Sequence, residues 1–138
     1  MSCMASCSLS RHTTLVALGF AVSGCDSVVA PVRAVLLPIS EIDAPASITQ
    51  GETLVVRLTV VFGGCRSFER LETTRAAGHV TFKAHGLDSS GPDVSCTADV
   101  RTQIVESRIE PPLTDPVTLV ALQPDASETT RTVRVTTR

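Results

Sequence analysis

The sequence predicts an all-β protein, a single antiparallel β-sandwich of about seven short strands. Three observations support this prediction. After residue 34, most segments alternate hydrophobic and polar residues with a period of two. Clusters of Gly, Pro, Asp and Ser separate these segments at short intervals, and no segment has a convincing helical pattern. Regularly spaced short strands of this kind are typical of a sandwich.

The chain begins with a pattern typical of export. Residues 15–22 are apolar, Arg11 and His12 precede them, and small residues follow. A helix needs about 20 apolar residues to cross a bilayer core, so this run is too short to span a membrane. A positive start, a short apolar run and small residues at its end predict a secretory signal.

The end of this run, Val22-Ser23-Gly24-Cys25, resembles the lipobox of bacterial lipoproteins. The resemblance implies cleavage between Gly24 and Cys25 and attachment of fatty chains such as palmitate to the Cys25 sulfur. Translation can start at Met1 or Met4 without changing the mature product. We therefore expect a signal peptide over 1–24, a tether over 25–34 and one domain over 35–138. The protein would be anchored by lipid to the cell membrane, facing the periplasm or the exterior.

The first part of the domain contains the clearest strand. Residues 35–42 are expected to form a strand with Pro38 at an edge or bulge, because proline cannot donate to a ladder. Turns over 44–47 and 49–52 follow, and Ile48 between them can enter the core. Residues 53–62 alternate strictly, which predicts an inward face made of Leu54, Val56, Leu58, Val60 and Phe62.

A hairpin is expected next. Gly63-Gly64 ends the previous strand, and residues 68–75 are assigned to a strand although the three-residue spacing of Phe68 and Leu71 also fits a helix. A turn over 76–78 leads into a strand over 79–84. In that strand Val80, Phe82 and Ala84 are expected to point inward and His79, Thr81, Lys83 and His85 outward. Residues 86–94 form the most loop-like segment.

Three further strands complete the predicted domain. They are expected over 103–110, which Pro111-Pro112 ends, over 117–122, and over 129–136 with Val133 and Val135 on one face. The order of strand, Gly-Gly-Cys65, Phe68, hairpin and Cys96, with a final hairpin, resembles small immunoglobulin-like domains of exported bacterial proteins.

Two cysteines remain once the signal and the acylated residue are set aside. Cys65 and Cys96 form an even pair, and outside the cytoplasm such a pair predicts a disulfide. A bridge closing a loop of this length would contribute roughly 3–4 kcal/mol of stability in the chain-entropy model.

Composition disfavours several partners. Without the signal, eleven Lys and Arg face fourteen Asp and Glu, and this acidic balance argues against nucleic acid. The chain has no Trp and no Tyr, so it lacks the platforms that usually stack sugars and bases.

No motif predicts an enzyme, a cofactor or a metal site. His79 and His85 would lie about 20 Å apart on one strand, too far to share an ion. Residues 86–91 do not supply the G-x-S-x-G pattern of a serine hydrolase. Arg66 and Arg70 beside Phe68 are the candidates for anion binding.

We therefore expect a lipid-anchored binding or structural module, with the membrane and another envelope protein as its partners. It would present the segments 63–75 and 86–96, which the disulfide connects. The alternative is a metal-handling protein or hydrolase that uses His79 or His85 with a loop carboxylate, Asp88 or Asp93.

Overall fold

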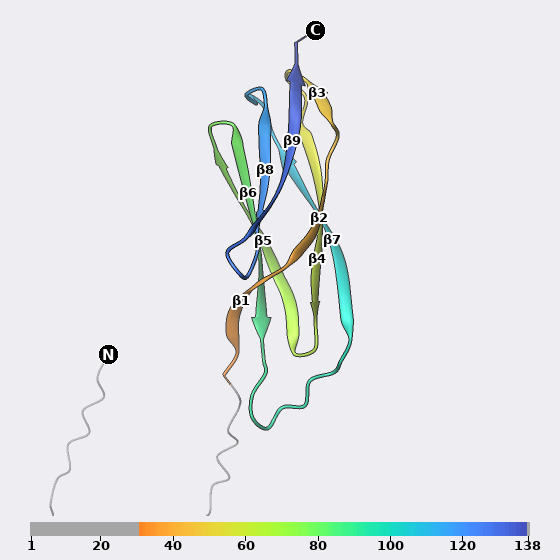
Figure 1. Cartoon of the computed structure of the whole chain (residues 1–138), viewed down its shortest axis with the longest axis vertical. Coiled ribbons are helices and arrows are strands. Elements are labelled where there is room, and N and C mark those ends of the chain that lie inside the picture. Colours follow the sequence, from red (N-terminus) through yellow and green to blue (C-terminus); the bar gives the residue numbers. More distant parts are fainter. Residues whose placement is uncertain (1–30, 138) are drawn as a thin grey trace, which may run out of the picture.

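Nine strands in two layers make up the part of the chain that the computed structural model describes, residues 31–137 (Figure 1). The predicted signal peptide, the cleavage site, Cys25 and most of the tether lie outside these residues. In chain order the strands are β1 (Arg33–Leu37), β2 (Ile39–Asp43), β3 (Ser47–Thr49), β4 (Leu54–Gly63), β5 (Arg66–Ala76), β6 (His79–Asp88), β7 (Val100–Ile109), β8 (Val117–Leu122) and β9 (Glu128–Thr136).

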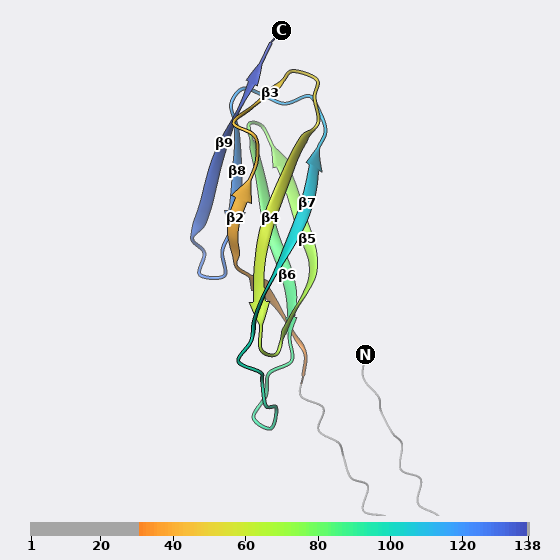
Figure 2. The same cartoon turned by 90° about the vertical axis from the view of Figure 1, so that its right-hand side faces the viewer.

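The larger sheet is organised around β6. One edge of β6 pairs with β5 along its whole length. Along the other edge, the second half of β6 pairs with β1 and the first half pairs with β8, which continues through β9 to β3. The smaller sheet has the order β2-β4-β7 and covers one side of the larger one (Figure 2). The all-β, two-sheet prediction is confirmed.

The prediction of a wholly antiparallel sandwich is wrong for two pairs of strands. β6 and β8 run parallel, and so do β3 and β9. The parallel β3 is only three residues long and contains Ile48, which the sequence placed in the core between two turns. Ile48 is partly buried and packs against the core, so its expected role is confirmed although its setting is a strand.

Pro38 separates β1 from β2 and marks the point where the chain passes from one sheet to the other. The predicted single strand over 35–42 is therefore two strands, and the first starts earlier, at Arg33. Proline has no N–H, but its carbonyl accepts a bond of 2.9 Å from the Val61 N–H. The Gln123 side chain donates to the Ile39 carbonyl and accepts from the Ile39 N–H, at 2.9 and 3.1 Å. These bonds pair the backbone groups that the switch takes out of a regular ladder.

The core lies between the two sheets and follows the predicted alternation. On β4 the inward residues named from the sequence are buried, with Phe62 partly so. On β6, Val80, Phe82 and Ala84 are buried, whereas the outward residues between them are not. Val133 of β9 is buried and Val135 is partly buried against the core. A period of two in the sequence therefore places these strands correctly.

Several strand boundaries differ from the prediction. β5 begins at Arg66 rather than at residue 68, and a bulge lies between Phe68 and Arg70. A bulge adds one residue to one strand, which explains why Phe68 and Leu71 share the inward side at a spacing of three. β6 extends to Asp88 through residues expected in a loop, and β7 begins at Val100 instead of residue 103. Residues 89–99 form the connection that remains. Within residues 31–137, no helix has the length and hydrophobicity needed to cross a membrane.

Candidate functional site

The predicted disulfide is present and defines one end of the sandwich. Cys65 lies in the turn between β4 and β5, Cys96 lies in the 89–99 connection, and their Cα atoms are 5.0 Å apart. The Ser89 N–H and hydroxyl both donate to the Cys65 carbonyl at 3.0 Å. β1 begins at the same end, because Arg33 and Arg66 both lie opposite Asp88 in the ladders of β6. We call this region the disulfide end.

Of the two segments that we expected the domain to present, residues 63–75 are mostly strand and residues 86–96 are mostly outside the strands. Residues 66–75 belong to β5, residues 86–88 belong to β6, and only the turn at 64–65 and the 89–99 connection lie outside the ladders. The strand expected over 68–75 is therefore confirmed, whereas the loop expected over 86–94 is wrong for residues 86–88. The reason is that β1 and β5 both pair with the last residues of β6, including Gly86.

Arg66 is paired with a carboxylate of its own chain. Its Nε lies 3.1 Å from Asp88 Oδ2, and about half of the Arg66 side chain is exposed. Hydrogen bonds from Ser90, together with the Arg66 guanidinium, lower the pKa of Asp88 from 3.8 to about 2. A guanidinium already neutralised in this way is a poor receptor for a further anion.

Phe68 and Arg70 do not form a common surface with Arg66. Phe68 packs against the core. Arg70, after the bulge, lies opposite His85, whose side chain points outward. The exposed face there holds a charged cluster in which Glu72 lies 2.8 Å from His85 Nε2 and 3.7 Å from Lys83 Nζ. The hydrogen bond from His85 is the main cause of a lowered pKa for the Glu72 carboxyl. The structure thus separates the three predicted binding residues instead of bringing them together.

The two histidines lie at different places along β6. His79 is the first residue of the strand, where its Nδ1 lies 3.2 Å from the Ala77 carbonyl, and His85 is six positions further along. Asp88 is paired with Arg66, and Asp93 lies in the 89–99 connection. Among residues 31–137, no group of three or more His, Cys, Asp or Glu side chains is arranged to hold a metal ion.

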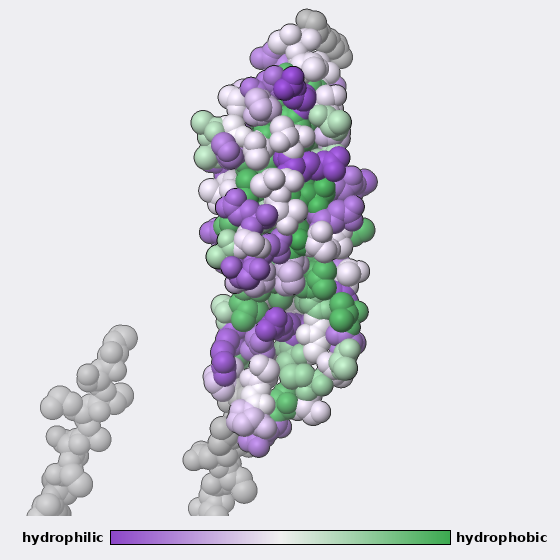
Figure 3. Space-filling view, in the orientation of Figure 1, coloured by the Kyte–Doolittle hydropathy of each residue, from purple (hydrophilic) through white to green (hydrophobic). Residues whose placement is uncertain are grey.

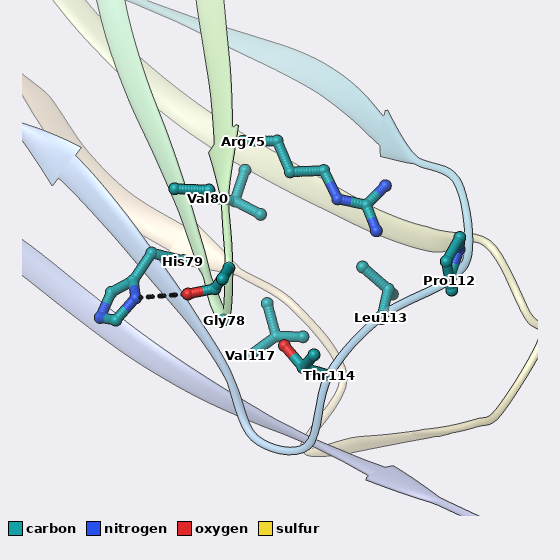
Figure 4. A pocket seen from close by; sticks show the side chains of 10 residues that line it. Arg75, Gly78, His79, Val80, Pro112, Leu113, Thr114 and Val117 are labelled. Atoms are coloured by element: carbon teal, nitrogen blue, oxygen red, sulfur yellow. Dashed lines mark hydrogen bonds between the residues drawn. The ribbon is translucent and has the colours of Figure 1, made fainter.

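The opposite end of the sandwich carries a small pocket, which we call the distal pocket. It has a volume of about 260 Å³ and lies between the β5–β6 turn and the connection from β7 to β8. Figure 4 shows Arg75 and Leu113 on one side of it and Gly78, Thr114 and Val117 on the other. The Thr118 N–H donates to the Gly78 carbonyl at 2.8 Å, which holds the turn against the start of β8.

Arg75 is the main charged group of the distal pocket. Its Nη1 donates to the Glu110 carbonyl at 2.5 Å, which links the guanidinium to the start of the connection from β7 to β8. Within residues 31–137, no carboxylate lies within ion-pair distance of this guanidinium. A cation beside the partly exposed apolar side chain of Leu113 suits an anionic group attached to an apolar body.

Sequence reasoning did not find the distal pocket. Arg75 and Leu113 are far apart in the sequence, and no motif links them. Only the pairing of β6 with β8 brings the turn at 77–78 to the connection at 110–116. The prolines at 111, 112 and 116 marked that connection as a turn, but a turn alone does not indicate a pocket.

Comparison with known proteins identified no relative of this chain. No protein-family model matches the chain, and neither curated proteins nor solved structures gave a significant match. No family, homologue or structural neighbour therefore indicates a catalytic activity for this chain.

Proposed function

We propose that this protein is a lipid-anchored module of the bacterial cell envelope that binds a partner through its distal end. The anchor is Cys25, released as the new N-terminus by cleavage after Gly24. The domain that it carries is an immunoglobulin-like sandwich with a binding or structural role. The signal pattern of residues 11–25 and the disulfide, which suits an oxidising compartment, both support this proposal.

The proposal rests on the position at which the chain enters the domain. Arg33 lies at the disulfide end, opposite Asp88. Cys25 is eight residues before Arg33. Eight fully extended residues span at most about 28 Å. The entry point lies beside Asp88, at one end of β6, and the distal pocket lies beside His79, at the other end. The length of this strand places them about 30 Å apart. A lipid on Cys25 therefore holds the disulfide end near the membrane and leaves the distal pocket as the end available to a partner.

The end proposed to face a partner therefore differs from the one expected from the sequence, which was formed by segments 63–75 and 86–96. The disulfide-linked segments are on the side of the anchor, whereas Arg75 and Leu113 are on the side away from it. The distal pocket also has the features that the residues at 66, 68 and 70 lack, a cation without a carboxylate beside it and an adjacent apolar wall.

Metabolic labelling with a palmitate analogue tests the anchor. The full chain should incorporate the label and Cys25→Ser should not, because the serine hydroxyl cannot replace the acylated sulfur. Cys7→Ser is the matched control, since Cys7 lies in the removed segment and its loss should leave labelling unchanged. Labelling of the Cys25→Ser variant at the level of the full chain would show that the attachment site is wrong.

Affinity capture from detergent extract tests the binding end. Arg75→Glu should lose the partner that the unaltered chain retains, because the substitution reverses the charge at the pocket mouth. Arg108→Glu is the matched control, as Arg108 is an exposed arginine of β7 that does not line the distal pocket. Equal loss of the partner by both variants would remove the distal pocket from the proposal.

A further inference from the structure

The exposed large hydrophobic residues gather toward one end of the sandwich. Within residues 31–137 there are four of them, and their exposed fractions are 57% for Val32, 38% for Val94, 77% for Val100 and 68% for Ile104. Val32 directly precedes β1, Val94 lies in the 89–99 connection, and Val100 lies opposite Gly63 at the start of β7. These three are at the disulfide end, and we call them the apolar tip.

Ile104 continues the apolar surface along β7. It lies on the same side of the strand as Val100, about 13 Å further from the tip. Hydrophobic residues are exposed over the face shown in Figure 3, including its lower half, which contains the disulfide end in Figure 1. A hollow of about 350 Å³, lined in part by Pro38, Val61 and Val100, lies at the same end.

Two ion pairs lie beside the apolar tip. Arg66 binds Asp88, and Arg101 binds Asp99, so each guanidinium has a carboxylate in contact with it. A hydrogen bond from the Thr97 hydroxyl, followed by the contact with Arg101, lowers the pKa of Asp99, so this pair stays charged on both sides at neutral pH. Arg33 and Asp93 form no ion pair with each other, but their charges are opposite, so these six side chains have a net charge of zero. A locally neutral surface with exposed valines can approach a phospholipid surface without a large electrostatic barrier.

We infer that the apolar tip rests in the interfacial layer of the membrane, so that the domain stands on the bilayer with its long axis away from it. This inference rests on the proposed function, because the lipid on Cys25 supplies the attachment. The chain enters the domain beside Val32, and the eight-residue reach from Cys25 keeps the tip within about 28 Å of the acyl chains. Single apolar side chains bind a membrane weakly, but a covalent anchor makes their insertion an intramolecular event.

Tryptophan fluorescence in lipid vesicles tests this inference, because the natural chain contains no Trp. The full lipidated Val100→Trp variant is reconstituted in phosphatidylcholine–phosphatidylglycerol vesicles, with and without brominated acyl chains. Ala77→Trp, in the β5–β6 turn beside the distal pocket, is the matched control. Bromine should quench the indole at position 100 at least about twofold more than the indole at position 77, since interfacial burial reaches only about 5–10 Å into the bilayer. Val94→Trp repeats the measurement in case Trp at position 100 disturbs β7.

Each other outcome overturns the inference in a recognisable way. Equal, weak quenching at positions 100 and 77 would mean that the tip does not touch the bilayer. Blue-shifted emission at position 100 without bromine quenching would assign the tip to a contact with a second copy of the chain. Intact mass of the same samples separates the two proposals. A lipidated chain without quenching contradicts the inference alone, whereas a chain without lipid contradicts the proposed function as well.

Discussion

The two ends of the sandwich differ in how β7 meets the core. Toward the distal end, Ser107 and Ile109 of this strand are buried. Toward the disulfide end, Arg101 and Gln103 lie on the same side of the strand but are exposed. Alternate residues of a strand share one side, so β7 leaves the core as it approaches the disulfide end. The disulfide therefore holds the end at which β7 no longer packs against the core. Packing and polar contacts hold the other end, including the 3.2 Å hydrogen bond between Thr73 and Ser107 that joins the two sheets.

Removing the disulfide should give the largest effect. Cys65→Ala is expected to lower the free energy of unfolding by about 3–4 kcal/mol, because it frees a loop of 31 residues. Urea denaturation measures the loss, and Cys96 should then react with maleimide. Ser67→Ala, two residues along the chain and exposed, is a control that should change little. Maleimide labelling of the unreduced natural chain to the same extent would contradict the bridge.

A pair of glycine substitutions compares the two ends at the level of the backbone. A Cβ on Gly63 would collide with the backbone carbonyl of Asp99 at the disulfide end, so Gly63→Ala should cost about 2–3 kcal/mol. At Gly78, beside the distal pocket, φ is +74° and the nearest atom is 3.6 Å away, so Gly78→Ala should cost only about 1 kcal/mol. Thermal denaturation of both variants gives the order. A larger loss for Gly78→Ala would show that the β4–β5 turn is not held against the 89–99 connection.

The smallest expected effect is the pH dependence that Asp88 contributes at the disulfide end. The bonds from Ser90 and Arg66 lower the pKa of Asp88 from 3.8 to about 2, so the folded state favours the carboxylate. This contribution to stability is present above pH 3.8 and is lost as the pH falls toward 2. The melting temperature of Asp88→Asn should therefore fall less steeply over this range than that of the natural chain. Asp93→Asn, in the 89–99 connection that follows Asp88, should keep the natural slope, and a parallel change in both variants would contradict the assignment.

The sequence predicted the elements whose pattern is local. The period of two is regular along β4 and the first part of β6 and is present at Val133 and Val135 of β9, and the pairing of Cys65 with Cys96 followed from counting cysteines. The sheet switch at Pro38 could not be predicted, because Leu37 and Ile39 are both buried and look the same whether one sheet or two receive them. The start of β5 was obscured by its bulge, which gives a strand the spacing of a helix.

The candidate site was less accessible to sequence reasoning than the fold. Arg66, Phe68 and Arg70 are close in sequence, but the strand and its bulge send them to different surroundings. Arg75 and Leu113 have no local pattern and meet only because β6 and β8 are neighbours in the sheet. The pocket depends on a long-range pairing, which periodicity does not encode.

The most direct test of the account is the intact mass of the protein purified from membranes. We predict an N-terminus at Cys25 carrying fatty acyl chains on its sulfur, which places the anchor eight residues from the disulfide end. An unmodified chain that begins at Met1 or Met4 would contradict both the anchor and the orientation of the two ends.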